Sequence, residues 1–185
     1  IDYIFNDRLA VVSDNAKGME DLFTYIYQMG HRRIAYIHGT DSAVTTNRLS
    51  SFYRTAEKLG VEIPDEYVMM TRYRDTKGAG EATEKLLDLR RPPTCIIYPD
   101  DFAAFGGIHV IRERGMSIPE DISIAGYDGI RLAKLTVPNL TTLCQDTQHL
   151  GQYAAEKLID LIEKPKTAMR NITIVQGKLL SLIHI

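Results

Sequence analysis

The sequence predicts an α/β fold in which helices flank a parallel sheet. Two observations carry this prediction. Short apolar runs rich in β-branched residues alternate with amphipathic helical segments from residue 34 to residue 125. The segments between the runs are long enough for the right-handed crossovers that join parallel strands. The length of 185 residues suffices for one ordinary domain with a sizeable core.

Composition and charge exclude several classes of protein. The chain is 44% hydrophobic and 25% charged, which is typical of a soluble globular protein. Its net charge of −2 does not indicate a nucleic-acid-binding surface. No apolar run approaches the ~18 residues of a membrane span. Cys95 and Cys144 lie in apolar, strand-like runs, so we expect reduced core thiols of a cytoplasmic protein rather than a disulfide.

The expected strands are short apolar runs bounded by turn residues. They lie at residues 3–5, 9–12, 34–37, 67–71, 94–98, 122–125, 140–143, 172–175 and 178–182. Five helices follow polar residues whose side chains can cap a first turn. These capping residues are Asp14 with Asn15, Thr45 with Thr46, Asp75 with Thr76, Asp100 with Asp101, and Asp146. The helices should run over residues 15–29, 47–59, 76–87, 102–114 and 146–163.

The strand at residues 122–125 leads into the most informative stretch of the chain. Gly126 and Gly129 follow it and allow the backbone to turn sharply. Asp128 is therefore expected just past the carboxyl end of a strand, where open α/β sheets bind their ligands. An alternative is that Asp128 only caps the turn.

Three motifs carry a resemblance to a known family. The run PEDISIAGYDG at residues 119–129 resembles a signature of the LacI/GalR family of bacterial transcriptional regulators. Two further motifs of that family resemble the run GHRRIA at residues 30–35 and the run LTT at residues 140–142 with Gln145 after it. The resemblance covers nearly the whole chain. It implies a periplasmic-binding-protein-like type I fold, in which two subdomains flank a ligand cleft.

The resemblance also implies a domain organisation. Residues 14–144 would form the main segment of the second, C-terminal subdomain. Residues 1–13 and 145–176 would be remnants of the first subdomain, whose larger part and DNA-binding headpiece are missing from this chain. Residues 177–185 would hold a return strand and a tail that departs from the family pattern and looks foreign.

Five residues are implied to bind the ligand: Arg48, Tyr73, Asp100, Asp128 and Gln145. The Arg48 guanidinium can hold two oxygens at once, whereas an ionised carboxylate at Asp100 or Asp128 accepts hydrogen bonds from hydroxyl groups or amines. The Tyr73 ring can pack on the apolar face of a sugar or base. We expect Arg48 and Asp128 to face each other across one end of the site.

Arg48 and Tyr73, like Asp128, also have a plain structural alternative. Arg48 would be an exposed helix-surface arginine on composition alone, and Tyr73 a core residue at a strand end. Asp101 matches a family position that mainly caps the helix, so we expect a structural role there. Asp100, Asp101 and Asp128 could instead hold Mg²⁺ in a phospho-acceptor or phosphatase domain.

The predicted function is that of a ligand-sensing domain. It would bind a sugar or related metabolite and control operator binding through the missing headpiece, as a homodimer in the cytoplasm. No cofactor, metal or membrane partner is expected. The sequence lacks the Gly-x-Ser-x-Gly, His-Glu-x-x-His and P-loop motifs of enzymes. The main alternative is a periplasmic solute-binding protein of a sugar transporter, which shares the fold.

Overall fold

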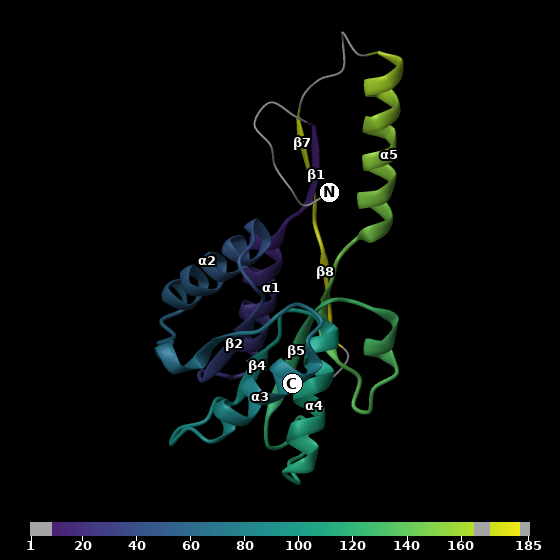
Figure 1. The fold of residues 1–185 in the computed structure, drawn as a ribbon. Coiled ribbons are helices and arrows are strands. Elements are labelled where there is room, and N and C mark those ends of the chain that lie inside the picture. The colour runs from purple at the N-terminus through teal and green to yellow at the C-terminus, as the bar shows by residue number, and fades with distance from the viewer. Residues whose placement is uncertain (1–8, 165–170, 182–185) are drawn as a thin grey trace.

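The computed structural model describes residues 9–164 and 171–181, which form a larger and a smaller body (Figure 1). The larger body holds a six-stranded sheet in the order β3-β2-β4-β5-β6-β8. Its strands are β2 (Ile34–His38), β3 (Val68–Met70), β4 (Cys95–Ile97), β5 (Ser123–Asp128), β6 (Thr141–Cys144) and β8 (Lys178–Leu180). Every pairing in this sheet is parallel except that of β6 with β8. The predicted α/β fold with a mostly parallel sheet is confirmed.

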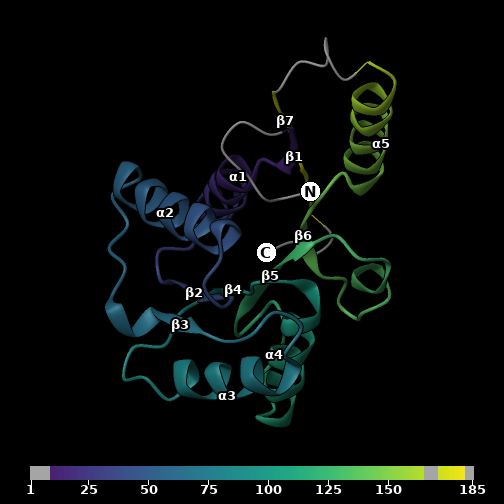
Figure 2. The same cartoon turned by 45° about the horizontal axis from the view of Figure 1, so that its top comes forward.

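Helices cover both faces of this sheet (Figure 2). They are α1 (Asn15–Gln28) and α2 (Ala43–Lys58) on one face, and α3 (Thr76–Leu87) and α4 (Asp101–Glu113) on the other. Successive β2 residues alternate between the two cores: Ile34 and Tyr36 pack under α1 and α2, while Ala35 and Ile37 pack under α3 and α4. This alternation follows from the two-residue period of a strand. Burial on both faces explains why the strands are continuous apolar runs.

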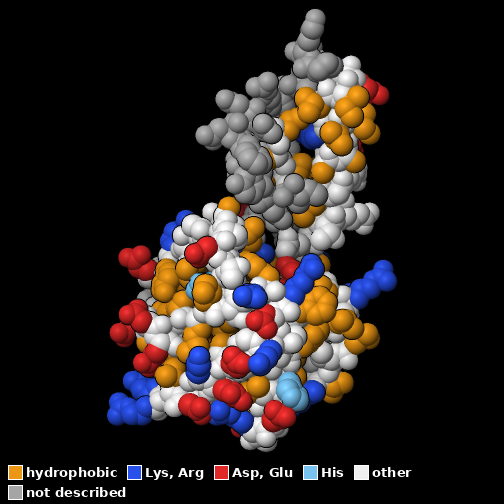
Figure 3. All heavy atoms as spheres, viewed as in Figure 1, with side chains coloured by type: hydrophobic (Ala, Val, Ile, Leu, Met, Phe, Trp, Pro, Cys, Tyr) orange, Lys and Arg blue, Asp and Glu red, His pale blue; other side chains and the backbone are white. Residues whose placement is uncertain are grey.

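The smaller body consists of β1 (Ala10–Ser13), β7 (Ile172–Val175) and α5 (Thr147–Glu163). The two strands pair in parallel, and Leu150 of α5 packs on Val11 and Val175. The chain passes between the bodies at three crossovers, after β1, after β6 and after β7. Apolar side chains of α5 gather on the surface of this body (Figure 3). They include Leu158, Ile159, Leu161 and Ile162.

Several expected boundaries need correction. The strand expected at 122–125 runs on to Asp128, with Gly126 inside it rather than at a turn. A side chain at Gly126 would overlap the Asp101 carboxylate, so close packing explains this glycine. The turn comes at Gly129, with a φ of 71°. Helix α2 begins about one turn earlier than expected, because Ser42 rather than Thr45 caps it.

Two short 3₁₀ helices complete the larger body, η1 (Asp65–Tyr67) and η2 (Arg131–Lys134). Because η1 takes up Tyr67, the strand expected from that residue begins at Val68. The expected strand at residues 3–5 and the proposed foreign tail from residue 182 lie outside the described residues. Among the described helices, none has the length and apolar character needed to cross a bilayer.

Candidate functional site

Arg48 is a buried cation at the candidate site. Its side chain enters from α2 and is only 2% exposed. Nε donates to Oδ1 of Asn15 at 2.9 Å, and Nη1 donates to the carbonyl oxygen of Pro99 at 3.0 Å. The guanidinium carbon lies 3.4 Å from the centre of the Tyr127 ring. These partners offset the desolvation of the charge, so Arg48 is not the exposed surface arginine of the structural alternative.

Asp128 ends β5 at the carboxyl edge of the sheet and faces Arg48, as expected. Its Oδ1 lies 3.9 Å from Nη2 of Arg48 and accepts a hydrogen bond from Nε2 of Gln145 at 2.5 Å. No donor among the described residues reaches its Oδ2, and the side chain is 34% exposed. Burial raises the pKa of Asp128, whereas Arg48 and Gln145 oppose that rise. The backbone is also strained, since φ is 104°.

Gln145 follows β6 and lies at the second crossover. Besides its bond to Asp128, its Oε1 accepts a hydrogen bond from Oγ of Ser13 at 2.7 Å. Its backbone N–H donates to the Asp128 carbonyl oxygen at 3.2 Å. The structure thus brings three of the five predicted residues together, Arg48, Asp128 and Gln145, beside the junction of the two bodies.

The two neighbouring aspartates correct one expectation. Asp100, not Asp101, caps α4, because its backbone is extended and its Oδ1 accepts from the Ala103 N–H at 2.8 Å. Oδ2 of Asp100 accepts from the Arg74 N–H at 2.7 Å, and the side chain is buried. The carboxylate therefore holds the loop that follows β3. Ligand contact by Asp100 stays a prediction.

Asp101 holds the turn that directly follows Asp128. Its carboxylate accepts hydrogen bonds from the Thr142 hydroxyl at 2.6 Å and from the Ile130 N–H at 2.8 Å. Its role is structural, as expected, but it links β6 to the turn after β5 instead of capping α4.

Tyr73 lies on the loop between β3 and α3. Its hydroxyl is 2.9 Å from Oγ1 of Thr45, and its ring packs so closely on Gly39 that a side chain there would overlap it. The ring is partly exposed. Stacking on a ligand stays a prediction for this residue.

Sequence reasoning missed three residues that hold this site together: Asn15 and Tyr127, which contact Arg48, and Ser13, which contacts Gln145. The sequence offers both Asp14 and Asn15 as caps, but Asp14 alone caps α1, and Oδ1 of Asn15 accepts from Arg48 instead. Tyr127 directly precedes Asp128 in the motif at residues 119–129, and this position could have indicated that it lies at the site. The sequence offered no signal for Ser13.

The magnesium alternative finds no support in this geometry. The carboxylates of Asp100 and Asp101 accept hydrogen bonds from separate protein donors. Within residues 9–164 and 171–181, no group of three or more His, Cys, Asp or Glu side chains is arranged to hold a metal ion.

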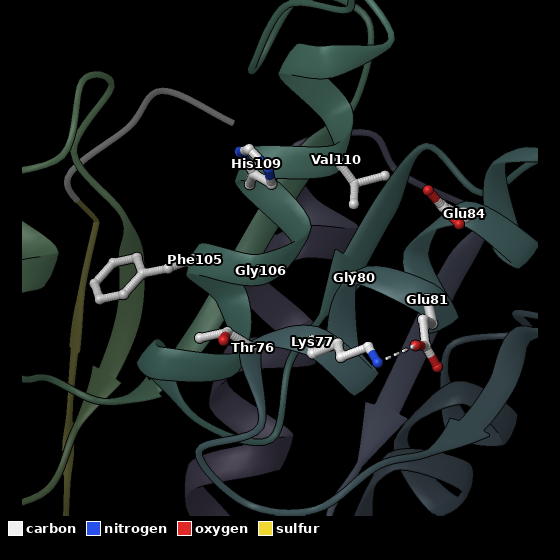
Figure 4. Close-up of a pocket in the computed structure, with 9 residues that line it drawn as sticks. All are labelled: Thr76, Lys77, Gly80, Glu81, Glu84, Phe105, Gly106, His109 and Val110. Carbon is white, nitrogen blue, oxygen red and sulfur yellow. Dashed lines mark ion pairs between the residues drawn. The ribbon is translucent and has the colours of Figure 1, made fainter.

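A hollow of about 470 Å³ lies elsewhere, on the outer surface between α3 and α4 (Figure 4). Thr76, Phe105, Gly106 and His109 are among its lining residues, and none of the five predicted ligand residues lines it. The hollow is therefore separate from the candidate site.

The pH dependence of stability provides a test of Asp101. Burial raises its pKa to about 6, against the opposing effect of its hydrogen bonds. Because the folded pKa exceeds the ordinary value of 3.8, the folded state binds more protons between these two values. The contribution of Asp101 to stability is therefore largest below about pH 4 and is lost as the pH rises through 6. The loss should be on the order of 2–3 kcal/mol, at about 1.4 kcal/mol per pKa unit.

Urea denaturation of the wild type and of Asp101→Asn from pH 4 to pH 7 measures this effect. The wild type should lose stability relative to the variant over that range. If the free energies of unfolding of the two proteins change in parallel with pH, the raised pKa of Asp101 is contradicted. A constant difference in stability between them does not affect this test.

Comparisons with known proteins agree with this architecture. Residues 23–180 match the model of the periplasmic binding protein-like domain family. The chain is 29% identical to the probable HTH-type transcriptional repressor ExuR of Bacillus subtilis, over 88% of this chain and 49% of that protein. It is 30% identical to the HTH-type transcriptional repressor CytR of Escherichia coli, over 81% of this chain and 44% of that protein. The chain thus spans about half the length of these curated relatives.

Two solved structures resemble the fold closely. A putative LacI transcriptional regulator from Bacillus cereus subsp. cytotoxis superposes with a TM-score of 0.89 at 28% identity, covering 97% of this chain and 64% of that one. A LacI family regulator from Enterococcus faecium with bound ribose superposes with a TM-score of 0.86 at 26% identity, covering 97% and 66%.

Proposed function

Because the chain belongs to the periplasmic binding protein-like domain family, as an effector-binding domain of the LacI-family regulators, we propose that it senses a small polar metabolite. Its relatives are transcriptional regulators, and the chain is a binding domain rather than an enzyme. The signal would control operator binding by a DNA-binding headpiece in the same protein. Such a regulator acts in the cytoplasm, where its operator lies.

The observation that carries this proposal is the arrangement of Arg48, Asp128 and Gln145 beside the crossovers. Asp128 offers Oδ2 as an acceptor, and the buried Arg48 guanidinium keeps a positive charge next to it. A ligand with several hydroxyl groups can donate to the carboxylate without leaving a charge unpaired. The effector would thus be a sugar or a related metabolite. The ribose bound by the Enterococcus faecium regulator supports this class.

We further propose that the regulator works as a homodimer. Leu132, Leu135 and Val137, on η2 and the loop after it, are 47%, 75% and 79% exposed. Adjacent exposed apolar side chains of this kind mark interaction surfaces, and a second copy of the chain would cover them.

The function can be tested on the purified gene product that contains this chain. Mobility-shift assays with DNA from upstream of its own gene, with and without D-ribose and a panel of other sugars, measure operator binding and its response. We expect sequence-specific retention that one sugar changes at least tenfold. DNA binding that no sugar affects, or no sequence-specific binding, would contradict the proposal.

Asp128→Asn tests the ligand contact directly. The variant keeps the side-chain shape but turns one acceptor into a donor, so binding of the sugar selected above should weaken by about 1.5–3 kcal/mol, as for hydrogen bonds to charged groups. Calorimetric titration measures the loss. Asp121→Asn is the matched control, because that exposed carboxylate accepts only from the Ser117 N–H, at 2.7 Å, among the described residues. Unchanged affinity in Asp128→Asn would show that the site lies elsewhere.

A further inference from the structure

A continuous chain of hydrogen bonds leads from Asp128 into the junction between the two bodies. The Gln145 amide uses both of its ends: Nε2 donates to Asp128 at 2.5 Å, and Oε1 accepts from the Ser13 hydroxyl at 2.7 Å. Ser13 and Gln145 are 132 positions apart in the sequence. Nothing in the local structure of either segment requires this contact.

The Oε1 end of the Gln145 amide contacts one crossover segment, at Ser13, and Gln145 itself lies in a second one, after β6. Ser13 ends β1, and the next residue, Asp14, donates its N–H to the Val175 carbonyl oxygen at 2.8 Å, at the end of β7. Gln145 itself precedes Asp146, which caps α5 by accepting from the His149 N–H at 3.0 Å. The relay therefore joins the first two crossover segments, and the backbone bond of Asp14 ties the end of β7, before the third crossover, to the first.

We infer that Gln145 is a positioning residue that couples the state of the Asp128 carboxylate to the crossovers. The inference rests on the proposed function, because it assigns how effector occupancy of that site is transmitted. A ligand hydroxyl that donates to Oδ2 of Asp128 draws charge away from Oδ1 of the same carboxylate, and this weakens the bond that Oδ1 accepts from Gln145. Since the amide is a single rigid plane, any shift of Nε2 also displaces Oε1 from Ser13. Hydrogen bonds in such a partly buried chain strengthen one another, so weakening one bond weakens the next.

Hydrogen exchange of this chain tests the coupling without any ligand. The reporter is the backbone N–H of Gln145, which donates to the Asp128 carbonyl oxygen. This bond lies at the Asp128 end of the relay, away from Ser13. Ser13→Ala should speed its exchange about 3- to 10-fold, as expected for the loss of roughly one hydrogen bond's stabilisation. Gln145→Met keeps a side chain of similar length but removes both bonds. Ser50→Ala, on the exposed face of α2, is the matched control and should change nothing.

Non-additivity is the deciding result. Ser13→Ala added to Gln145→Met should speed exchange no further than Gln145→Met alone, because the relay is already broken. Additive effects, or an unchanged Gln145 N–H in Ser13→Ala, would overturn the inference.

A second measurement separates this inference from the proposed function. In the gene product, Ser13→Ala should lower the ratio of operator affinities with and without D-ribose about 3- to 10-fold, or with the panel sugar that gives the largest response if ribose gives none. A normal sugar response in the variant would overturn the relay and leave the proposed function intact. If the wild type shows no response to any sugar, while Ser13→Ala still speeds exchange of the Gln145 backbone N–H, the proposed function alone is contradicted.

Discussion

Replacing Arg48 by methionine is expected to destabilise the fold by about 3–5 kcal/mol, the usual cost of removing one partner from a buried charged network. The substitution preserves most of the side-chain volume, so the loss comes from the groups left behind. Oδ1 of Asn15 and the carbonyl oxygen of Pro99 would lose their donors in a region closed to water. The Asp128 carboxylate would lose the only cation within ion-pair distance among the described residues. Urea denaturation measures the effect.

A matched control separates burial from the loss of charge. Arg54 lies on the same helix, α2, but is exposed and has no hydrogen-bond or ion-pair partner among the described residues. Arg54→Met should change the free energy of unfolding by less than about 0.5 kcal/mol, as surface substitutions do. Equal losses in the two variants would show that the guanidinium contacts of Arg48 do not hold the site together.

The sequence predicted the fold because its strongest signals are local. Alternating apolar runs and helices specify parallel βαβ units, and the capping carboxylates of Asp14, Asp75 and Asp146 are confirmed by their bonds to first-turn N–H groups. The errors arose where a residue had two physical explanations. Gly126 suggested the end of a strand, but its small size is needed for the close approach of Asp101. Asp100 and Asp101 can both cap a helix, and only the backbone conformation decides between them.

The candidate site was predictable in part. Arg48 and Asp128 each follow a strand of one parallel sheet, so their meeting at its carboxyl edge follows from topology alone. The contact of Ser13 with Gln145 depends on the pairing of β1 with β7, which lie about 160 residues apart in a separate sheet. No local pattern encodes such a pairing, because it is decided by how the two bodies assemble. For the same reason the sequence indicates a helix cap at Asn15 and does not reveal its hydrogen bond with Arg48, which comes from α2.

The packing of α3 on α4 gives the second large expected effect. Gly106 lies on α4 where Thr76 begins α3, and both line the hollow between these helices (Figure 4). A methyl group at this position would overlap the Thr76 carbonyl oxygen, and backbone cannot swing away as a flexible side chain could. Gly106→Ala should therefore force the helices apart and cost about 3 kcal/mol, near the upper end for overpacked cores.

A glycine-to-alanine substitution where the added methyl group has room should instead stabilise the fold. Gly151 lies in α5, and among the described residues no atom outside its chain neighbours and the nearby helix backbone comes within 4 Å of the added methyl group. Gly151→Ala should therefore stabilise the protein by about 0.5–1 kcal/mol through helix propensity. Thermal denaturation of the two variants compares them directly. A Gly106→Ala protein as stable as the wild type would mean that α3 can shift along α4 without loss. The close contact at Thr76 would then not fix the spacing of these two helices, or the position of the Asp100 carboxylate that caps α4.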